Sequence, residues 1–515
     1  MALSLITSAS YAADELVAEF GQLPPAFLPV GHRRLYEIQI GLLPAPVYLT
    51  LPASYRVPDI DRERLNAAGV RIIEVPDGLR LGESIDFALE TIGHVDAAVR
   101  LLHGDTVIYD LPGGNDVIAV GEAPDAYAWG AADDSQQSSD AAVLAGYFAF
   151  ADGLTLRRSL AVSQGDFVAA VHEYGHQRPL ARAQVESWLD CGHLQTYYRS
   201  RCSIRTNRAF NALSMDYRRV EKRSSDKAKM AAEAGWYQKL PAPLRLYTPA
   251  FLGRCEETEA QAGYAIEYVP SPSLHELFVF GDLAQSGWRN VLSACFEFLA
   301  ACNQYDAGPQ QRPPLETLTA AKTPARLDAF LQAAGIAAGT EWRYRGQALP
   351  SLHEIVRLTS AEIDLKRQDL FGVMHGDLCF PNAFYDFRTR RIRAIDPRGG
   401  VGAEPGIHGD LRYDLAKLNH SVHGLYDFIL TERFACTGFA ERDLAIDFPA
   451  HPGIDRVSGI AREFDLGGCR LGDRENTAIT IQLFLSMLPL HSDRPDRQQA
   501  FLANALRLFA QWSEA

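Results

Sequence analysis

The sequence predicts two domains: an α/β domain at residues 1–204 and an α+β domain at residues 205–515. Three observations support this. The chain has 515 residues, more than one hydrophobic core usually organises. Short apolar runs alternate with amphipathic stretches up to about residue 200. Beyond that point a few strand-like pieces precede mostly helical patterns, so we expect a small lobe at 205–285 and a helical lobe at 286–515.

The first domain is expected to contain a parallel sheet. Alternation of buried strands with helices is typical of that architecture. Strands are expected at residues 3–7, 47–51, 70–75, 98–102 and 117–120, and helices at 61–68 and 84–91. The polar stretch GAADDSQQSSD, at 130–140, is expected to be a loop.

Charge and cysteine content exclude several classes of protein. The net charge of −14 argues against nucleic acid or an anionic membrane as a partner. Eight scattered cysteines without a C-x-x-C pair indicate reduced thiols. No stretch reaches the roughly 20 apolar residues of a membrane span, and the first residues lack the basic start of a signal peptide. We therefore expect a cytoplasmic protein without membrane insertion.

The segment FGVMHGDLCFPNAFYD, followed by RIRAIDPRG, has the residue types that phosphoryl transfer requires. That reaction needs a carboxylate beside the acceptor hydroxyl, and an amide with a second carboxylate to hold Mg²⁺ on the phosphates. Asp377 and Asn382 lie five positions apart on an expected loop, and Asp396 follows an apolar strand at 392–395. The alternative is a loop whose Asp and Asn bond only their own backbone.

This H-G-D-x-x-x-x-N and I-D-P arrangement resembles the aminoglycoside phosphotransferase and choline kinase families, which have a bilobal protein-kinase-like fold. The resemblance implies that Asp377 is the catalytic base or orients the hydroxyl. It implies that Asn382 and Asp396 bind Mg²⁺. ATP would be the phosphoryl donor, and a hydroxyl of a small molecule the acceptor.

Two residues of the expected small lobe complete the pattern. Lys222 lies on an apparent strand, and Glu233 follows eleven residues later in a helical stretch. A kinase-like lobe needs such a lysine to bind the phosphates of ATP and such a glutamate to hold the lysine. An exposed pair on a charged helix would give the same pattern. A glycine-rich phosphate loop is missing, and NRAFN, at 207–211, stands in its place. Asp414, in DLRYDLAKL, matches a position that the resemblance makes a brace for the catalytic loop.

Three segments of the first domain resemble the sugar-phosphate nucleotidyltransferases, which have a Rossmann-like, GT-A-like core. They are PPAFLPVGHRRLYE, at 24–37, LLHGDTVI with Asp105, and WLDCGH with Asp190. The resemblance implies that Asp105 and Asp190 hold a metal ion. Such an ion would relieve the repulsion between a phosphate monoester and a second nucleoside triphosphate, whose base the sequence does not specify.

This half departs from the nucleotidyltransferase pattern in its phosphate-binding loop. The family's G-x-G-T-R-L segment is replaced by ITSASY, at 6–11. Arg33 and Arg34 are candidates for the missing positive charge. Glycosyltransferases share the core and also use paired aspartates, so that activity stays open, as does a purely structural domain.

Together the two halves predict a bifunctional enzyme. It would phosphorylate a hydroxyl of a small alcohol or sugar, and then couple the phosphate to a nucleotide. The product would be an NDP-activated precursor of the kind used for capsule or lipopolysaccharide synthesis. One alternative is a stand-alone small-molecule kinase whose first domain confers specificity. Another is a pseudokinase scaffold that binds nucleotide without chemistry.

Overall fold

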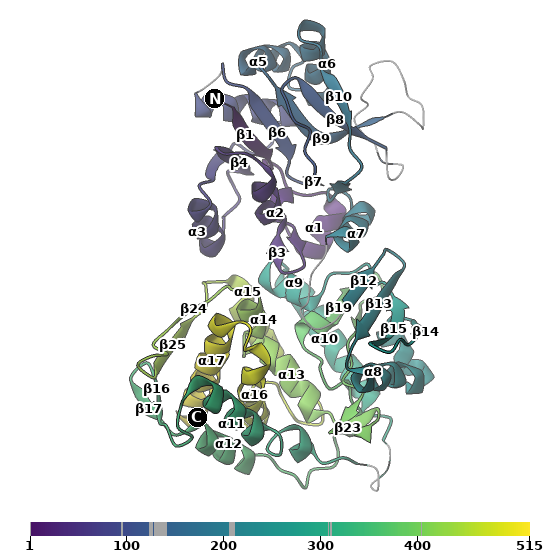
Figure 1. The fold of residues 1–515 in the computed structure, drawn as a ribbon, viewed down its shortest axis with the longest axis vertical. Helices are drawn as coiled ribbons and strands as arrows, with labels where there is room; N and C mark the ends of the chain where they lie inside the picture. Colours follow the sequence, from purple (N-terminus) through teal and green to yellow (C-terminus); the bar gives the residue numbers. More distant parts are fainter. Residues whose placement is uncertain are drawn as a thin grey trace. The chain divides into compact units, whose positions relative to one another are not determined.

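The computed structural model describes residues 2–93, 96–122, 127, 142–204, 212–306, 308, 312–402 and 404–514. The chain forms two compact units (Figure 1). Unit 1 is Met1–Thr206 with Phe280–Asp282, and unit 2 is Asn207–Val279 with Leu283–Ala515. The expected loops at 130–140 and 207–211 lie outside the described residues. None of the helices in the described ranges has both the length and the hydropathy of a membrane span.

Unit 1 is built on a seven-stranded sheet in the order β10-β8-β9-β6-β1-β4-β5. All five predicted strands are present, with largely buried side chains except in the edge strand β5, where Arg71 and Glu74 are exposed. The strands are β1 (Leu3–Thr7), β4 (Val47–Pro52), β5 (Arg71–Val75), β6 (Val99–His103), β8 (Val117–Gly121), β9 (Val143–Phe150) and β10 (Ala181–Gln184). The predicted strands β1, β4, β5 and β6 pair in parallel, but the sheet also contains a strand that was not predicted. β9 pairs antiparallel with both β6 and β8, so the sheet is mixed.

The helices of unit 1 in the described residues are α1 (Asp14–Phe20), α2 (Leu35–Leu42), α3 (Asp59–Ala67), α4 (Leu81–Ile92), α5 (Gly153–Val162), α6 (Phe167–Gln177) and α7 (Leu194–Ser203). α4, α5 and α6 bury their apolar faces on the sheet. α3 and α4 correspond to the helices predicted at 61–68 and 84–91, and α3 ends one residue earlier than predicted. Ile85, Leu156 and Val171, from α4, α5 and α6, pack in one core with Leu5 and Leu101 of the central strands. Two short ribbons pair β2 (Pro29–Val30) with β3 (Arg33–Arg34), and β7 (Thr106–Ile108) with β11 (Trp188–Asp190).

Unit 2 begins with an antiparallel sheet in the order β12-β13-β15-β14. Its strands are β12 (Ala212–Met215), β13 (Arg219–Ser224), β14 (Phe251–Arg254) and β15 (Ala262–Glu267). The strand-like stretch 213–223 is a hairpin, because the Asp216 carboxylate accepts backbone N–H bonds from Arg218 and Arg219 at 2.7 and 2.9 Å and closes a turn. The predicted helix after it is α8 (Lys227–Lys239), whose cap is Asp226.

A mostly helical lobe follows, as predicted. Its helices are α9 (Leu274–Val279), α10 (Gln285–Cys302), α11 (Thr323–Ala334), α12 (Leu352–Ala361), α13 (Arg412–Val422), α14 (Tyr426–Leu430), α15 (Pro452–Ala461), α16 (Arg474–Met487) and α17 (Pro495–Glu514). α16 and α17 supply much of the core. The lobe also has a small sheet of β16 (Trp342–Tyr344), β17 (Gln347–Leu349), β24 (Ala435–Thr437) and β25 (Asp443–Asp447), which the sequence does not predict.

Two further ribbons position the segment that carries the phosphotransferase motif. β18 (Phe371–Val373) pairs with β23 (His408–Asp410), and β19 (Ala383–Asp386) pairs with β20 (Arg391–Ala394). The loop between β18 and β19 contains Asp377 and Asn382, and Asp396 follows β20. A third ribbon, β21 (Gly400–Val401) with β22 (Glu404–Pro405), lies in the connection back to β23.

Candidate active sites

The loop between β18 and β19 brings Asp377 and Asn382 together. The Asn382 side-chain amide donates to the Asp377 carbonyl oxygen and to its carboxylate Oδ2, each at 3.0 Å. Lys417, on α13, places its Nζ 2.8 Å from the other carboxylate oxygen. Both oxygens of Asp377 are therefore held, while 38% of its side chain stays exposed. That exposure leaves the carboxylate accessible to a substrate.

Charge keeps Asp377 ionised. Burial alone would raise the pKa of this carboxyl, but the Lys417 ammonium outweighs burial and holds the pKa well below its usual value. The same contact raises the pKa of Lys417 above that of a free lysine. At neutral pH the pair is a carboxylate and an ammonium, so Asp377 can accept a hydrogen bond from a hydroxyl.

Asp414 braces the loop, as expected. Its carboxylate accepts the backbone N–H groups of His375 and Gly376 at 2.8 and 2.7 Å. Burial raises the pKa of Asp414 to about 7, although these two bonds oppose the shift. His375 is buried against the Trp236 ring, at 5.5 Å between ring centroids, and burial lowers its pKa to about 4. A neutral His375 therefore supports the loop from within the core.

Lys222, on β13, connects two carboxylates. Its Nζ lies 2.7 Å from Oε2 of Glu233, on α8, and 3.1 Å from Oδ1 of Asp396. The predicted Lys222–Glu233 ion pair is thus present and buried, with 8% and 2% of the side chains exposed. The Tyr264 hydroxyl, from β15, donates to the same Glu233 oxygen at 2.8 Å. These contacts fix the lysine beside Asp396.

Asp396 adopts a backbone conformation that few residue types tolerate. Its φ is +56°, in the left-handed region, where aspartate is enriched among non-glycine residues. Three residues later, Gly399 lies so close to α8 that an added Cβ would be 2.4 Å from the carbonyl carbon of Ala232. Ala232 directly precedes Glu233. Close packing at Gly399 therefore holds α8, and with it the Lys222–Glu233 pair, against the Asp396 segment.

The donor atoms at this site fit Mg²⁺. Asp396 offers a carboxylate and Asn382 an amide oxygen, which are the ligand types that this ion prefers alongside substrate phosphates. Among the described residues, no group of three or more His, Cys, Asp and Glu side chains is placed to hold a metal. An ion bound by Asp396 and Asn382 would therefore take its remaining ligands from phosphates and water.

Sequence reasoning missed Lys417. A signal for it exists, because Lys417 lies three residues after Asp414 in DLRYDLAKL. Residues three apart lie on the same face of a helix. Once Asp414 is assigned to the catalytic loop, the next turn of that face must also point toward it.

In unit 1, the β7–β11 ribbon brings Asp105 and Asp190 together. Asp190 is paired with Thr106, the neighbour of Asp105, and the Cys191 N–H donates to the Asp105 carbonyl at 2.7 Å. A Cβ added to Gly192 would lie 2.4 Å from the Asp105 carboxylate. Glycine is therefore required at position 192, because any side chain there would collide with the Asp105 carboxylate.

The two carboxylates repel one another. Burial and the charge of Asp190 raise the pKa of Asp105 to about 6. Asp190 accepts hydrogen bonds from Thr196 and, at 2.9 Å, shares one with Nδ1 of His193. A divalent cation bound by the two carboxylates would relieve this repulsion.

The prediction that Arg34 supplies positive charge for phosphate binding needs a correction. Arg34 is buried: its guanidinium pairs with Asp61 at 3.2 Å and donates to the Phe27 carbonyl at 2.8 Å. It therefore has a structural role. The loop after β1, which replaces the family's glycine-rich segment, leads into α1, whose first turn carries Asp14 and Glu15. Two acidic groups at this helix start disfavour a triphosphate there.

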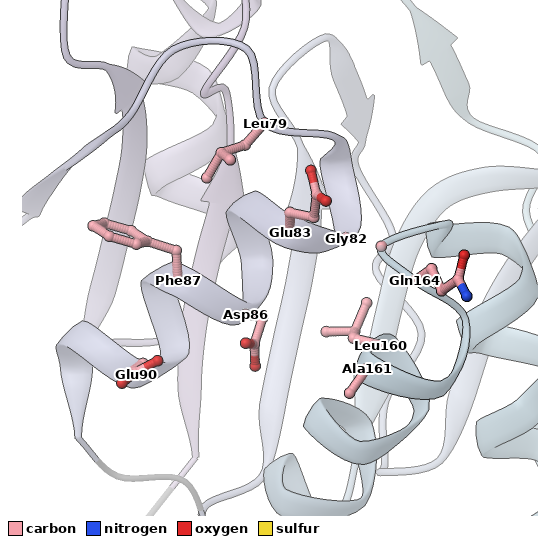
Figure 2. A pocket seen from close by; sticks show the side chains of 10 residues that line it. Leu79, Gly82, Glu83, Asp86, Phe87, Glu90, Leu160, Ala161 and Gln164 are labelled. Carbon is pink, nitrogen blue, oxygen red and sulfur yellow. The ribbon is translucent and has the colours of Figure 1, made fainter.

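A shallow pocket lies elsewhere in unit 1, between α4 and the end of α5 (Figure 2). Its acidic side chains, Glu83, Asp86 and Glu90, come from α4. Arg157 pairs with Asp86 and Glu90, which neutralises much of this charge. None of the predicted site residues is among the residues that line this pocket.

No protein-family model matches the sequence, and no curated protein sequence matches it. Solved structures do match. A nucleoside-diphosphate-sugar pyrophosphorylase from Vibrio cholerae RC9 is 12% identical over 38% of this chain and 98% of its own, with a TM-score of 0.31. A 4-diphosphocytidyl-2C-methyl-D-erythritol synthase is 16% identical over 39% of this chain and 96% of its own, with a TM-score of 0.27. A thermostable mutant of an aminoglycoside phosphotransferase is 13% identical over 60% of this chain and 94% of its own, with a TM-score of 0.38. The chain is thus similar in fold to nucleotidyltransferases and to aminoglycoside phosphotransferases.

Proposed function

We propose that unit 2 is a Mg²⁺- and ATP-dependent phosphotransferase that acts on a hydroxyl of a small molecule. One observation carries the proposal: Lys222 links Glu233 and Asp396, so a lysine suited to phosphates lies beside a carboxylate suited to Mg²⁺. Asp377, held ionised by Lys417, supplies the group that orients the acceptor.

In this reaction the acceptor oxygen forms a bond to the γ-phosphorus, and the bond from that phosphorus to the β–γ bridging oxygen breaks. ADP leaves. The acceptor's proton passes to Asp377 and then to solvent. A carboxylate with a lowered pKa is a weak base, so its main contribution is orientation, with proton transfer late in the reaction. Mg²⁺, when bound at Asp396 and Asn382, supplies charge neutralisation on the phosphates.

The test is ADP formation from Mg²⁺ and ATP with a mixture of polyols, sugars and amino alcohols. We expect phosphomonoester formation in the wild type and its loss in Asp377→Asn. If the protein binds ATP without turnover, and Asp377→Asn does not change that binding, unit 2 would instead be a pseudokinase scaffold.

We further propose that unit 1 is a nucleotidyltransferase that uses the phosphomonoester made by unit 2. A phosphate oxygen would attack the α-phosphorus of a nucleoside triphosphate and release pyrophosphate. The adjacent Asp105 and Asp190 support this, because such a reaction brings two polyanions together. The product would be an NDP-activated precursor for capsule or lipopolysaccharide synthesis. We place both reactions in the cytoplasm, where the free state of all eight cysteines is favoured.

Pyrophosphate release, with each of the four nucleoside triphosphates and the phosphomonoester, tests the second activity. Loss in both Asp105→Ala and Asp190→Ala is the expected result. Pyrophosphate release that neither substitution changes would contradict the assignment. Phosphomonoester without pyrophosphate would leave a stand-alone kinase, and cleavage of an added NDP-sugar would indicate a glycosyltransferase.

A further inference from the structure

Beside Asp377, unit 2 contains a group of cationic side chains that the reaction as described does not use. We refer to Lys322, Arg398 and Tyr413 as the cationic cluster. The Tyr413 hydroxyl lies 3.1 Å from Nζ of Lys322 and 3.1 Å from a guanidinium nitrogen of Arg398. Both cations also lie over the Tyr413 ring, at 5.3 and 5.4 Å from its centroid. One buried ring thus holds two positive charges together.

The cluster adjoins the catalytic loop. Nε of Arg398 donates to the carbonyl of Gly376, the residue before Asp377, at 3.3 Å. Tyr413 is on α13, one turn before Lys417, and Lys322 directly precedes α11. Three separate segments of the helical lobe therefore converge beside the catalytic loop, while Lys222 comes from the sheet of the small lobe.

Charge at the cluster is only partly balanced, because the carboxylates of Asp377 and Asp414 act on Arg398 from beyond ion-pair distance and not on Lys322. Among the described residues, no carboxylate lies within ion-pair distance of Lys322 or Arg398; their bonds go to Tyr413 and to Gly376. Arg326, one turn into α11, adds a third positive charge, and its guanidinium donates to the Ser486 carbonyl. Burial and the charge of Arg398 lower the pKa of Lys322 to about 8, and the two cations lower that of Tyr413 to about 8 despite its burial. Partly buried cations that repel one another are costly unless an anion joins them.

We infer that the cationic cluster binds an acidic group on the acceptor, so that the substrate of unit 2 is a small alcohol that also carries a carboxylate or a phosphate. This rests on the proposed phosphotransferase function. A guanidinium and an ammonium side by side suit an oxyanion, because the guanidinium fork matches two oxygens and the ammonium a third. The anchored acceptor would present its hydroxyl to Asp377.

A binding experiment tests this without turnover. Calorimetry of the full chain saturated with Mg²⁺ and ADP would use inorganic phosphate, glycerate and glycerol as probes. We expect at least one of the two anions to bind and glycerol not to bind. Lys322→Gln should weaken anion binding about tenfold, the value of one charge-assisted hydrogen bond, and Lys322→Arg should retain it. Lys366→Gln, which removes an exposed lysine of the same unit, is the matched control. Absence of anion binding, or equal binding by Lys322→Gln and wild type, would overturn the inference.

Turnover separates this inference from the proposed function. ADP formation that depends on Asp377 tests the phosphotransferase itself. Given that activity, a matched series of glycerol, glycerate and glycerol phosphate tests the cluster and distinguishes carboxylate from phosphate. We expect an acidic member to be preferred, with its KM raised about tenfold by Lys322→Gln and the KM for ATP changed much less. A preference for glycerol would contradict the inference. An equal rise in the KM for ATP would also contradict it, because the cluster would then bind the nucleotide and not the acceptor.

Discussion

The carboxylates of the two candidate sites have different electrostatic surroundings. In unit 2, Asp377 lies against Lys417 at 2.8 Å, and Asp396 lies against Lys222 at 3.1 Å. In unit 1, Asp105 lies near another carboxylate, that of Asp190. The pKa values shift accordingly: that of Asp377 falls, and that of Asp105 rises to about 6.

This difference indicates how each site depends on added cations. Unit 2 carries its own counter-charges, so its geometry is set before any ligand binds. Unit 1 holds two acidic groups in mutual repulsion, and a divalent cation would supply the missing positive charge. Substitution of a site carboxylate in unit 2 should therefore lower both stability and activity. In unit 1 it should raise stability and lower activity.

The largest effect is expected from Asp377→Asn. It keeps the side-chain shape but removes the group that orients the acceptor, so kcat should fall about 10³-fold. It also leaves Lys417 buried without its counter-charge, so the free energy of unfolding should fall by a few kcal/mol, roughly 3. Steady-state kinetics and urea unfolding measure the two effects.

The double variant Asp377→Asn with Lys417→Met sharpens this prediction. Removing both charges should restore most of the stability but none of the activity. A single variant that stays active would remove Asp377 from the chemistry. A double variant as unstable as the single one would show that the pair is not the source of the instability.

Lys222→Met comes next. It removes the link between Glu233 and Asp396, and we expect kcat/KM for ATP to fall about 100-fold, as when one preorganised donor to a developing charge is lost. Lys239→Met, which changes an exposed lysine of α8, is the control. Similar kinetics in the two variants would contradict the proposed ATP site.

In unit 1, Asp105→Asn should increase stability in the absence of metal. The substitution removes one of two repelling charges, and a pKa raised to about 6 at this site makes a gain of about 1–3 kcal/mol at pH 8 reasonable. The same variant should lose Mn²⁺ binding, measured by calorimetry. Asp110→Asn, at an exposed position nearby, should do neither. A destabilised, metal-binding Asp105→Asn protein would contradict the account of this pair.

The smallest expected effect concerns acid stability. His420 is buried between Tyr426 and Phe484, and its ring centroid lies 4.3 and 4.1 Å from theirs. Among the described residues, neither ring nitrogen of His420 has a hydrogen-bond partner. Burial holds its pKa well below 6.5. The unfolded chain therefore takes up a proton below pH 6.5 that the folded chain does not, and stability falls as the pH falls.

His420→Leu should remove that contribution. Between pH 6.5 and 5.5 it should reduce the loss of stability by about 1 kcal/mol. Hydrogen exchange of α13 and α16 at the two pH values measures this. His176→Leu, an exposed position in unit 1, serves as control, and an unchanged pH dependence in His420→Leu would exclude burial as the cause.

Much of the architecture could be predicted from the sequence. Central strands of unit 1 follow from mostly apolar runs such as 47–51, because a strand buried on both faces has no polar alternation. The antiparallel direction of β9 could not be predicted, because direction depends on the path of the connection and not on the strand's own residues. The strands β16 and β17 have three residues each, too few to show a period.

Site residues could be proposed from the sequence where they match a motif, even across long separations such as that between Asp105 and Asp190. Asp377, Asn382 and Asp396 lie within twenty positions, in a pattern that resembles the aminoglycoside phosphotransferase and choline kinase families. Lys322 lies more than fifty positions before Asp377, and ordinary surface lysines look the same in sequence. Its role depends on Tyr413 and Arg398, which only the tertiary fold brings to it.

The central claim is that unit 2 transfers the γ-phosphoryl group of ATP through Asp377. Phosphorus NMR of the full chain with Mg²⁺, ATP and a mixture of sugars, polyols and their acids tests it most directly, with Asp377→Asn in parallel. The account predicts a phosphomonoester signal growing with ADP in the wild type, and no such signal in the variant. A phosphomonoester formed equally by both proteins, or ATP left unchanged by the wild type across the mixture, would contradict it.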